Sequence, residues 1–558
     1  MEEIVDDYNS HLPFNGRPPD PRLHRFSSLF LLLLTALLCL PVLAVAASWL
    51  QWDAVTAGIL GEMASTVLPG YVGTSLWLCL LVAVGVVLVG TASAAAVTLF
   101  DFPGRRTAEW ALLLPLAMPA YVVAYAYTDF LQFGGPAQTW LRAAFGLQGR
   151  VLPEIRSLGG AAWVFTFSLY PYVYLLARTA LGERASHLME AARLLGAPLS
   201  RRIREVALPL ARPAIAAGAA LALMETLADY GVVSYFGIQT FTAGIYKAWL
   251  SMDNRIAAAQ LATLLLVVVA ALLALEQRAQ RRLRFVTPRG GRAGTGEAQP
   301  VVLRGAPRLL AWAVVGLPVL LGFVLPVAFM LRPLAADWSV LPWGRFLDWS
   351  FNSVRLGLLT AVLAVALALW LAFMQRCGSG RLVRGAVQVA GLGYAIPGAV
   401  IVVGLLLPVG WLQTVWPQSG VGYLMTATVL GLVWAYLVRF CAIALQSVQS
   451  GYSRVPVSLD DSARMLGAGG PDLLWRVHLP LLRRSTAAAA LLVFVDVMKE
   501  LPATLVLRPF NTDTLAVVAY QLARDERLGE AALPSLALVL VGLIPVLLLS
   551  RTLRARTG

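Results

Sequence analysis

The sequence has few charged residues, and lysine is almost absent. Charged residues make up 13% of the 558 positions and hydrophobic ones 59%, which is too apolar for a soluble chain of this length. The only lysines are Lys247 and Lys499, and neither follows a glycine. A phosphate-binding loop of the form G-x-x-x-x-G-K-[S/T] is therefore missing. The chain is an integral membrane protein that cannot hydrolyse ATP by a Walker mechanism.

Cysteine and histidine are equally sparse, with four of each. The cysteines lie in or beside apolar runs without C-x-x-C spacing, and the histidines show no ligand spacing, which argues against a disulfide framework and a zinc site. No nucleophile and base, or cofactor-binding set, appears in the polar loops. We therefore expect neither an enzyme nor a bound cofactor. The residues are Cys39, Cys79, Cys377, Cys441, His11, His24, His187 and His478.

Long hydrophobic runs are abundant instead. A membrane-spanning helix needs about 20 mostly apolar residues, and the runs are too long and too leucine-rich for the alternating strands of a barrel. We predict an all-α membrane protein with about twelve transmembrane helices. The first run follows a polar tail and is read as a retained helix, with a cleaved signal peptide as the alternative. The runs are 28–50, 74–99, 108–131, 159–181, 214–237, 256–275, 308–331, 353–375, 385–411, 421–446, 487–507 and 533–550.

The net charge of +14 could suggest a nucleic-acid partner. However, the arginines gather on alternate connections between the apolar runs, as the positive-inside rule describes. With twelve spans, this pattern places both termini in the cytoplasm and predicts a lipid bilayer, and no nucleic acid, as partner. The arginines concerned are Arg105, Arg106, Arg184, Arg193, Arg201, Arg202, Arg204, Arg212, those from Arg278 to Arg308, Arg551, Arg554 and Arg556.

The two halves of the chain repeat each other. Pro397 follows Pro119 by 278 positions, and Gly467 follows Gly196 by 271. Each half holds six runs in the same orientation, which indicates two parallel six-helix repeats about an axis along the membrane normal. A basic, glycine-rich segment joins them. We predict a cytoplasmic tail at 1–27, a first repeat at 28–276, a cytoplasmic linker at 277–307 and a second repeat at 308–558 with a short basic tail.

One polar loop occurs in both halves. It reads Glu190-Ala-Ala-Arg-Leu-Leu-Gly196 in the first half and Asp461-Ser-Ala-Arg-Met-Leu-Gly467 in the second. The apolar positions of the first copy fall on one face of a helix. The glycine suits a helix C-cap, and the Leu-Pro that follows stops the helix from continuing. An amphipathic helix lying on the lipid surface without a partner is the alternative reading.

These loops resemble the coupling loop of binding-protein-dependent ABC importer permeases. The resemblance implies that loops 183–213 and 447–486 each form a short helix that docks on a separate cytoplasmic ABC ATPase. Two ATPase copies and their ATP would then drive alternating access. The second copy departs from the pattern, so its grip on the ATPase is expected to differ. The implied coupling residues are Glu190, Ala191, Ala192, Gly196, Pro209, Asp461, Ser462, Ala463, Gly467 and Pro480.

Two carboxylates follow each loop inside an apolar run. Glu225 matches Asp496 and Asp229 matches Glu500, so each half is expected to place two acids at i and i+4 on one face of a membrane helix. A charge at bilayer depth costs about 2.5–3.5 kcal/mol on insertion scales and usually faces a pathway. We predict a cation pathway, with these four acids as transient metal ligands. Alternatively, Lys499 and arginines neutralise them as structural ion pairs, or the acids lie near a helix end in water.

The surrounding sequence resembles ferric-iron ABC permeases. The stretch from Glu225 to Trp249 is similar to their first half and the stretch from Lys499 to Tyr520 to their second. The resemblance implies a permease of the bacterial inner membrane that receives Fe³⁺ from a periplasmic iron-binding protein. Thiamine and polyamine permeases share this architecture, so a different small solute stays open, as does an ion-coupled secondary transporter.

Overall fold

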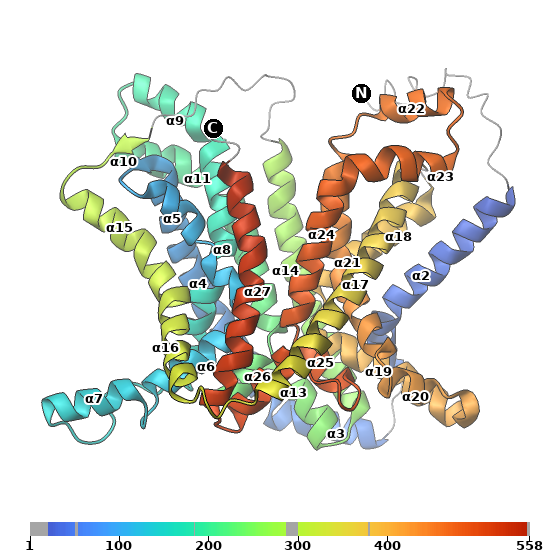
Figure 1. Ribbon diagram of the computed structural model, residues 1–558, viewed down its shortest axis with the longest axis horizontal. Coiled ribbons are helices and arrows are strands. Elements are labelled where there is room, and N and C mark those ends of the chain that lie inside the picture. The colour runs from blue at the N-terminus through green and yellow to red at the C-terminus, as the bar shows by residue number, and fades with distance from the viewer. Residues whose placement is uncertain (1–20, 51–53, 184, 286–299, 378–379, 555–558) are drawn as a thin grey trace.

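The protein is almost entirely helical. The computed structural model describes residues 21–50, 54–183, 185–285, 300–377 and 380–554. The strand pair within these ranges joins β1 (Phe100–Asp101) to β2 (Val301–Val302) in parallel (Figure 1). The predicted all-α class is therefore confirmed.

The helices fall into two series that follow the two halves of the sequence. The first comprises α2 (Pro21–Ala47), α3 (Ala54–Thr66), α4 (Leu68–Leu99), α5 (Arg105–Ala111), α6 (Ala120–Leu131), α7 (Pro136–Phe145), α8 (Leu158–Glu183), α9 (Ala185–Leu194), α10 (Leu199–Arg202), α11 (Leu208–Ala228), α12 (Gly231–Tyr235), α13 (Phe241–Tyr246) and α14 (Arg255–Phe285). The second comprises α15 (Ala306–Val319), α16 (Leu325–Ala336), α17 (Trp343–Cys377), α18 (Arg381–Leu392), α19 (Gly398–Val415), α20 (Val421–Thr426), α21 (Leu430–Tyr452), α22 (Val457–Met465), α23 (Gly470–Asp472), α24 (Leu479–Lys499), α25 (Pro502–Leu507), α26 (Leu515–Arg524) and α27 (Leu528–Arg554). Short 3₁₀ turns lie at η1 (Ser48–Leu50), η2 (Leu114–Ala117), η6 (Gly393–Ala395) and η7 (Pro417–Ser419), and π turns at η3 (Ile203–Ala207), η4 (Lys247–Ser251), η5 (Leu320–Val324) and η8 (Leu473–His478).

The count of spans differs slightly from the predicted twelve. Within the described residues, ten helices are long and apolar enough to cross a membrane, and an eleventh span forms if the pair 105–117 and 120–145, bent by 89°, counts as one. The remaining predicted run lies on α24. That helix is only 21 residues long and carries charged side chains toward both ends, which leaves it no long uncharged stretch of spanning length; they are Arg483, Arg484, Asp496 and Lys499.

The repeat is visible helix by helix. α11 and α24 have the same length of 21 residues, and both their ends are related by 271 positions. The bend of the third span occurs at Pro119 and its counterpart at Pro397, because proline lacks the N–H that a continuous helix needs. A serine contact also recurs. Ser75 accepts a hydrogen bond from the N–H of Phe241, and Ser353 accepts one from that of Leu515.

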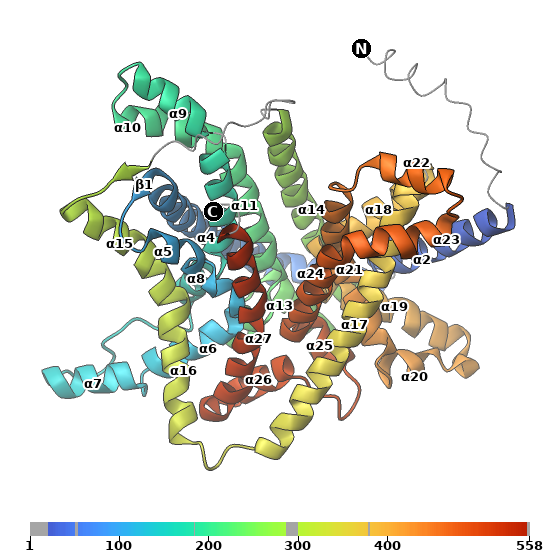
Figure 2. The same cartoon turned by 45° about the horizontal axis from the view of Figure 1, so that its top comes forward.

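The first helix of each half packs against the other half. α2 lies beside α18 and α19, whereas α15 and α16 lie beside α4 and α6 (Figures 1 and 2). Gly404 of α19 allows the Pro41 carbonyl of α2 to approach its backbone, and Gly322 of η5 does the same for the Phe167 carbonyl of α8. Such close approaches are a normal use of glycine in membrane helices. The two repeats are therefore continuous in sequence but interlocked in space.

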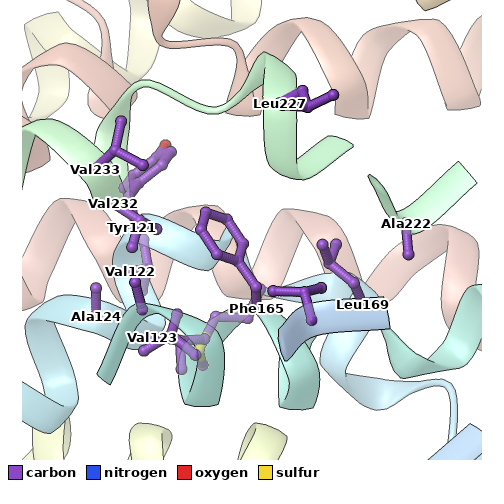
Figure 3. Packing of buried hydrophobic residues seen from close by; sticks show 14 of the residues in the cluster. Tyr121, Val122, Val123, Ala124, Phe165, Leu169, Ala222, Leu227, Val232 and Val233 are labelled. Atoms are coloured by element: carbon purple, nitrogen blue, oxygen red, sulfur yellow. The ribbon is translucent and has the colours of Figure 1, made fainter. Parts of the chain in front are cut away.

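The packed cores reflect this interlocking. The core of the second half includes Leu31, Leu34 and Leu38 of α2. The larger cluster is built mainly on the first half but also holds residues of α15 and α16. In Figure 3, α6 contributes Tyr121 to this cluster and α8 contributes Phe165. These helices form the wall of the site described below.

The middle of the predicted linker, 286–299, and most of the predicted N-terminal tail, 1–20, fall outside the described residues. The described residues on either side make the linker shorter than predicted. α14 continues to Phe285, and β2 already pairs with β1 before α15 begins. Helical structure therefore extends into a segment that its polar and glycine-rich composition predicted to be a linker.

Candidate functional site

The two repeated loops form matching short helices. α9 and α22 lie at the same end of the molecule but on opposite sides of it (Figures 1 and 2). Each ends in a left-handed glycine, Gly196 with φ of +81° and Gly467 with φ of +87°. The N–H of Ala197 donates to the Ala192 carbonyl, and that of Ala468 to the Ala463 carbonyl, as in a Schellman cap. The predicted helix with a glycine C-cap is confirmed in both copies.

An apolar pair stands out at the end of each helix. Leu194 and Leu195 are 81% and 88% exposed, and the matching Met465 and Leu466 are 88% and 89% exposed. Moving a side chain of this size from water into an apolar contact contributes about 1.5–3 kcal/mol of favourable free energy. We call these two exposed pairs the apolar knobs. Because the knobs match and lie at the same end of the molecule, two copies of one partner could bind them in the same way.

The acids of the two repeated loops lie beside these exposed apolar pairs on the surface. Glu190 forms an exposed ion pair with Arg193, and Asp461 forms a longer one with Arg464. Ser462 donates to the carbonyl of Ser458 within its own helix. Exposed pairs of this kind contribute little to stability. These side chains are therefore free to engage a partner.

The two helices are anchored to the membrane domain by different chemistry. In α22, Asp460 is buried and accepts hydrogen bonds from Arg376 at 2.8 Å and from His478 at 3.0 Å. His478 is held on its other ring nitrogen by the hydroxyl of Tyr452. In α9, the position matching Asp460 is the buried Met189. Among the described residues, this polar anchor is therefore a difference between the two copies that the loop sequences did not predict, and the expected difference in their grip on an ATPase stays a prediction.

A central cavity of about 180 Å³ lies between the halves. All four predicted carboxylates line it, so residues 271 positions apart in sequence meet at one site. Two cationic side chains and three tyrosines line it as well. The polar and ionisable lining residues are Glu225, Asp229, Asp496, Glu500, Arg439, Lys499, Tyr121, Tyr172, Tyr394 and Ser168.

The prediction that each acid pair shares one helix face is wrong. α11 ends at Ala228 and α24 at Lys499, so Asp229 and Glu500 are extended residues just beyond the helix ends. Each caps the next short helix: Asp229 accepts from the N–H of Val232 at 2.8 Å, and Glu500 accepts from two backbone N–H groups. An acid at a helix N-terminus satisfies free N–H groups and complements the helix dipole.

Glu500 also has a charged partner. Its Oε1 lies 3.2 Å from Nη1 of Arg439, and both side chains are nearly buried. The alternative that arginine neutralises the acids therefore applies to this one. Arg439 could have been found as the only charged residue inside the run 421–446, because an ionisable side chain within a span is rarely without a role.

Glu225 and Asp496 are placed differently from the two capping acids. They occupy matched positions inside α11 and α24, line the cavity and form no direct ion pair with a described residue. Tyr394 interacts with Glu225, and no local sequence pattern predicted this tyrosine. Within the described ranges, no group of three or more His, Cys, Asp or Glu side chains is arranged to hold a metal. The four acids therefore share a cavity without forming the predicted ligand cluster.

The halves are joined by tyrosines on one side of this cavity. The hydroxyl of Tyr246 donates to the Pro502 carbonyl at 2.7 Å, and that of Tyr520 pairs with Ser234 at 2.8 Å. Nearer the end of the molecule that carries α7, Arg156 bridges the halves by its ion pair with Glu526. These contacts close the interface between the halves on the side away from α9 and α22.

The comparisons with known proteins agree with this architecture. Residues 86–285 match the family described as binding-protein-dependent transport system inner membrane component. The first half of the chain therefore carries a domain of this permease family. The permease is 24% identical to an Fe(3+)-transport system permease protein of Haemophilus influenzae, over 84% of this chain and 87% of that protein. It is also 24% identical to a probable ABC transporter permease of Sinorhizobium fredii, over 86% of each chain. A putative 2-aminoethylphosphonate permease of Salmonella choleraesuis is 27% identical over only 31% of the permease.

The polar anchor of α22 gives a first prediction. Burial raises the pKa of the Asp460 carboxyl, but the hydrogen bonds from Arg376 and His478 outweigh it and hold that pKa below its usual value. Asp460→Asn removes the charge that Arg376 faces and should cost about 3 kcal/mol of stability around α22. Trypsin should then cleave faster after Arg454 and Arg464 in the detergent-purified permease.

Asp461→Asn is the matched control, because its side chain is 57% exposed and its ion pair is 3.8 Å long. Cleavage in this variant should match the wild type. A carboxyl with a lowered pKa stabilises the fold at neutral pH and loses this effect as pH falls through that pKa. The difference in melting temperature between wild type and Asp460→Asn should therefore shrink in acid. Equal cleavage of the two asparagine variants would contradict the anchor.

Proposed function

We propose that the permease carries ferric iron across the bacterial inner membrane. The observation that carries this proposal is the central cavity, which collects four carboxylates from two matched pairs. A hard, highly charged cation prefers carboxylate and other oxygen ligands. The relative from Haemophilus influenzae, which aligns with most of the chain, bears the name of an Fe(3+)-transport permease.

The cavity charge also separates this cargo from that of another relative. A 2-aminoethylphosphonate permease would have to accommodate a phosphonate anion, and its similarity covers only 31% of the chain. Here four acids face two cationic side chains, Arg439 and Lys499. This excess of negative charge favours a cation and repels an anion.

The partners follow from the two exposed ends of the molecule. We assign α9 and α22, with their apolar knobs, to two copies of a cytoplasmic ABC ATPase. The opposite end, which carries α7 and α20, would receive a periplasmic iron-binding protein (Figure 1). Closure of the ATPases on ATP would draw α9 and α22 together and part the tyrosine contacts beyond the cavity. ATP is thus used by the partner, and this chain needs no cofactor.

Reconstitution tests this function directly. Proteoliposomes are prepared with the permease and its ATPase, and the iron-loaded binding protein is added outside. They should take up ⁵⁵Fe only when ATP is present on the side of the membrane that carries the ATPase. Phosphonate and sulfate should not compete. Uptake by the permease alone, driven by a pH gradient, would overturn the ABC mechanism in favour of a secondary transporter.

The two unpaired acids give a second prediction. Glu225→Gln with Asp496→Asn removes two negative charges from the cavity but leaves the capping acids in place. We expect iron uptake to fall at least about tenfold, because each charge contributes more than 1 kcal/mol to a nearby cation in a poorly hydrated cavity. The amount of ATPase that co-purifies should stay unchanged. Wild-type uptake in this variant would remove both acids from the pathway.

A further inference from the structure

The positive charges of the cavity are not distributed as its acids are. The acids come in matched pairs from the two halves, but both cations come from the second half. In the first half, the position that matches Lys499 is Ala228, and the one that matches Arg439 is Ser168. The cations are thus an addition to a symmetric acidic site and are unrelated to the repeat itself.

Arg439 is committed to Glu500, but Lys499 is not committed to any carboxylate. Its Nζ donates to the carbonyl of Leu116 at 2.9 Å, which is its one hydrogen bond to a described residue. No direct ion pair of Lys499 occurs among the described residues, although Asp496 lies within electrostatic range. An ammonium has three donors, so most of its hydrogen-bonding capacity faces the cavity.

The path of the lysine stem is built by the fold. Lys499 is the last residue of α24 and reaches across to η2 of the other half. It passes Gly542 of α27, where an added Cβ would lie 2.9 Å from Lys499 Cε and would also meet the Ala117 carbonyl. Gly542 allows the Ala117 carbonyl to approach α27 closely, and the lysine stem runs beside this contact. Contacts with η2 and α27 therefore hold the Lys499 side chain, at the end of α24, against the cavity.

A second observation indicates space for a ligand beside it. Ser168 lines the cavity, is 3% exposed, and its hydroxyl has no hydrogen-bond partner among the described residues. Nε of Arg439 is likewise without one. A buried hydroxyl loses about 1–3 kcal/mol when unpaired, so such a group commonly meets a ligand or its hydration water.

We propose that the Lys499 ammonium is a tethered counter-cation for Asp496, which the transported cation must displace. This inference rests on the proposed cation transport and deepens it by naming a selectivity element. An ammonium on a flexible stem that lines the same cavity as Asp496 stays close to this acid at high effective concentration. A monovalent ion gains no more from each acid than the ammonium does, whereas the attraction of a trivalent ion is threefold larger at equal distance. Lys499 thus sets a charge threshold for entry.

Tb³⁺ binding to the purified permease tests this proposal without the ATPase or the binding protein. Lys499→Gln keeps a donor for the Leu116 carbonyl but removes the charge, and Lys499→Met removes both. We expect both variants to bind Tb³⁺ at least about tenfold more tightly than the wild type. Ca²⁺ should compete with Tb³⁺ more strongly in the variants than in the wild type. Lys499→Arg should behave like the wild type.

Tyr121→Phe is the matched control for a purely structural role. The Tyr121 hydroxyl also bridges the halves, to the carbonyl of Lys499, but it is neutral. An equal gain in Tb³⁺ affinity in Tyr121→Phe, or an unchanged affinity in both neutral Lys499 variants, would overturn the proposal. Adding Glu225→Gln and Asp496→Asn to Lys499→Gln should abolish the gain, and a persisting gain would place the binding elsewhere and overturn it as well.

The Tb³⁺ experiment and the iron-uptake experiment can fail independently of each other. Wild-type proteoliposomes that take up no iron would overturn ferric-iron transport. A gain of Tb³⁺ affinity in Lys499→Gln would still establish the counter-cation for another cationic substrate. Iron uptake by the wild type together with unchanged Tb³⁺ binding in Lys499→Gln would leave the cargo standing and remove the counter-cation.

Discussion

Replacing Leu194 and Leu195 by glutamate should detach the ATPase from the first coupling helix and abolish iron uptake. Both side chains are more than 80% exposed, so the substitution leaves the fold of the permease intact. In the complex, two leucines that leave water contribute about 3–6 kcal/mol, and a glutamate forced into the same contact reverses that gain. The number of ATPase copies that co-purify with each permease should fall from two to one.

The matching variant, with Met465 and Leu466 replaced by glutamate, tests the other helix. It should also lose one ATPase copy, and the combined variant should lose both. Leu194→Met is the control, because Met465 stands at the matching position of the second half. Full ATPase occupancy in the glutamate variants would assign the exposed pairs to another surface, such as the lipid headgroups.

The sequence predicted the coupling helices well because their signals are local. Apolar spacing and the glycine at Gly196 act within one or two helical turns, and the same pattern at Gly467 made the prediction independent of any single residue. The expectation that the prolines stop a helix is wrong, because Pro209 lies inside the continuous helical stretch Leu199–Ala228 and Pro480 inside the matching one. The helix and its cap follow from short-range hydrogen bonds. The role of the helix remains a prediction until a partner is bound.

The interlocking of the halves could not be predicted in this way. Nothing in the composition of α2 shows that it packs on α18 and α19, since its leucines would suit any apolar neighbour. The close approach of Gly404 to Pro41 joins residues more than 350 positions apart. In a membrane, helix partners are chosen by the shape of small residues and by few hydrogen bonds, which leave only a weak trace in one sequence.

For the four acids, the sequence predicted the shared site correctly but the local backbone structure of two of them wrongly. Their matched positions predicted a shared site, and the structure brings all four to one cavity. Periodicity alone extended α11 through Asp229 and α24 through Glu500. Pro502 was a signal against this, because the residue preceding a proline avoids the helical region and helices usually end before it. This difference divides the acids into two that cap helices and two that line the cavity without a direct ion pair to a described residue.

This division leads to the second large effect, which concerns Arg439. Arg439→Met leaves Glu500 in place with 1% of its side chain exposed and without its cation. Breaking a buried pair from one side costs about 3–5 kcal/mol. The backbone N–H groups of Ala503 and Thr504 still cap the carboxylate, so the permease should fold but unfold at a clearly lower temperature in detergent. Iron uptake should fall with the fraction folded.

Arg439→Met combined with Glu500→Gln provides the decisive comparison. A neutral amide retains an acceptor for one backbone N–H and leaves no buried charge, so most of the lost stability should return. Glu225→Gln offers the matched contrast, since no described cation pairs with Glu225 and its loss should change transport more than stability. If Arg439→Met and the double variant unfold alike, the ion pair is not what holds Glu500, and the acid at position 500 would rejoin Glu225 and Asp496 as a candidate for the cation path.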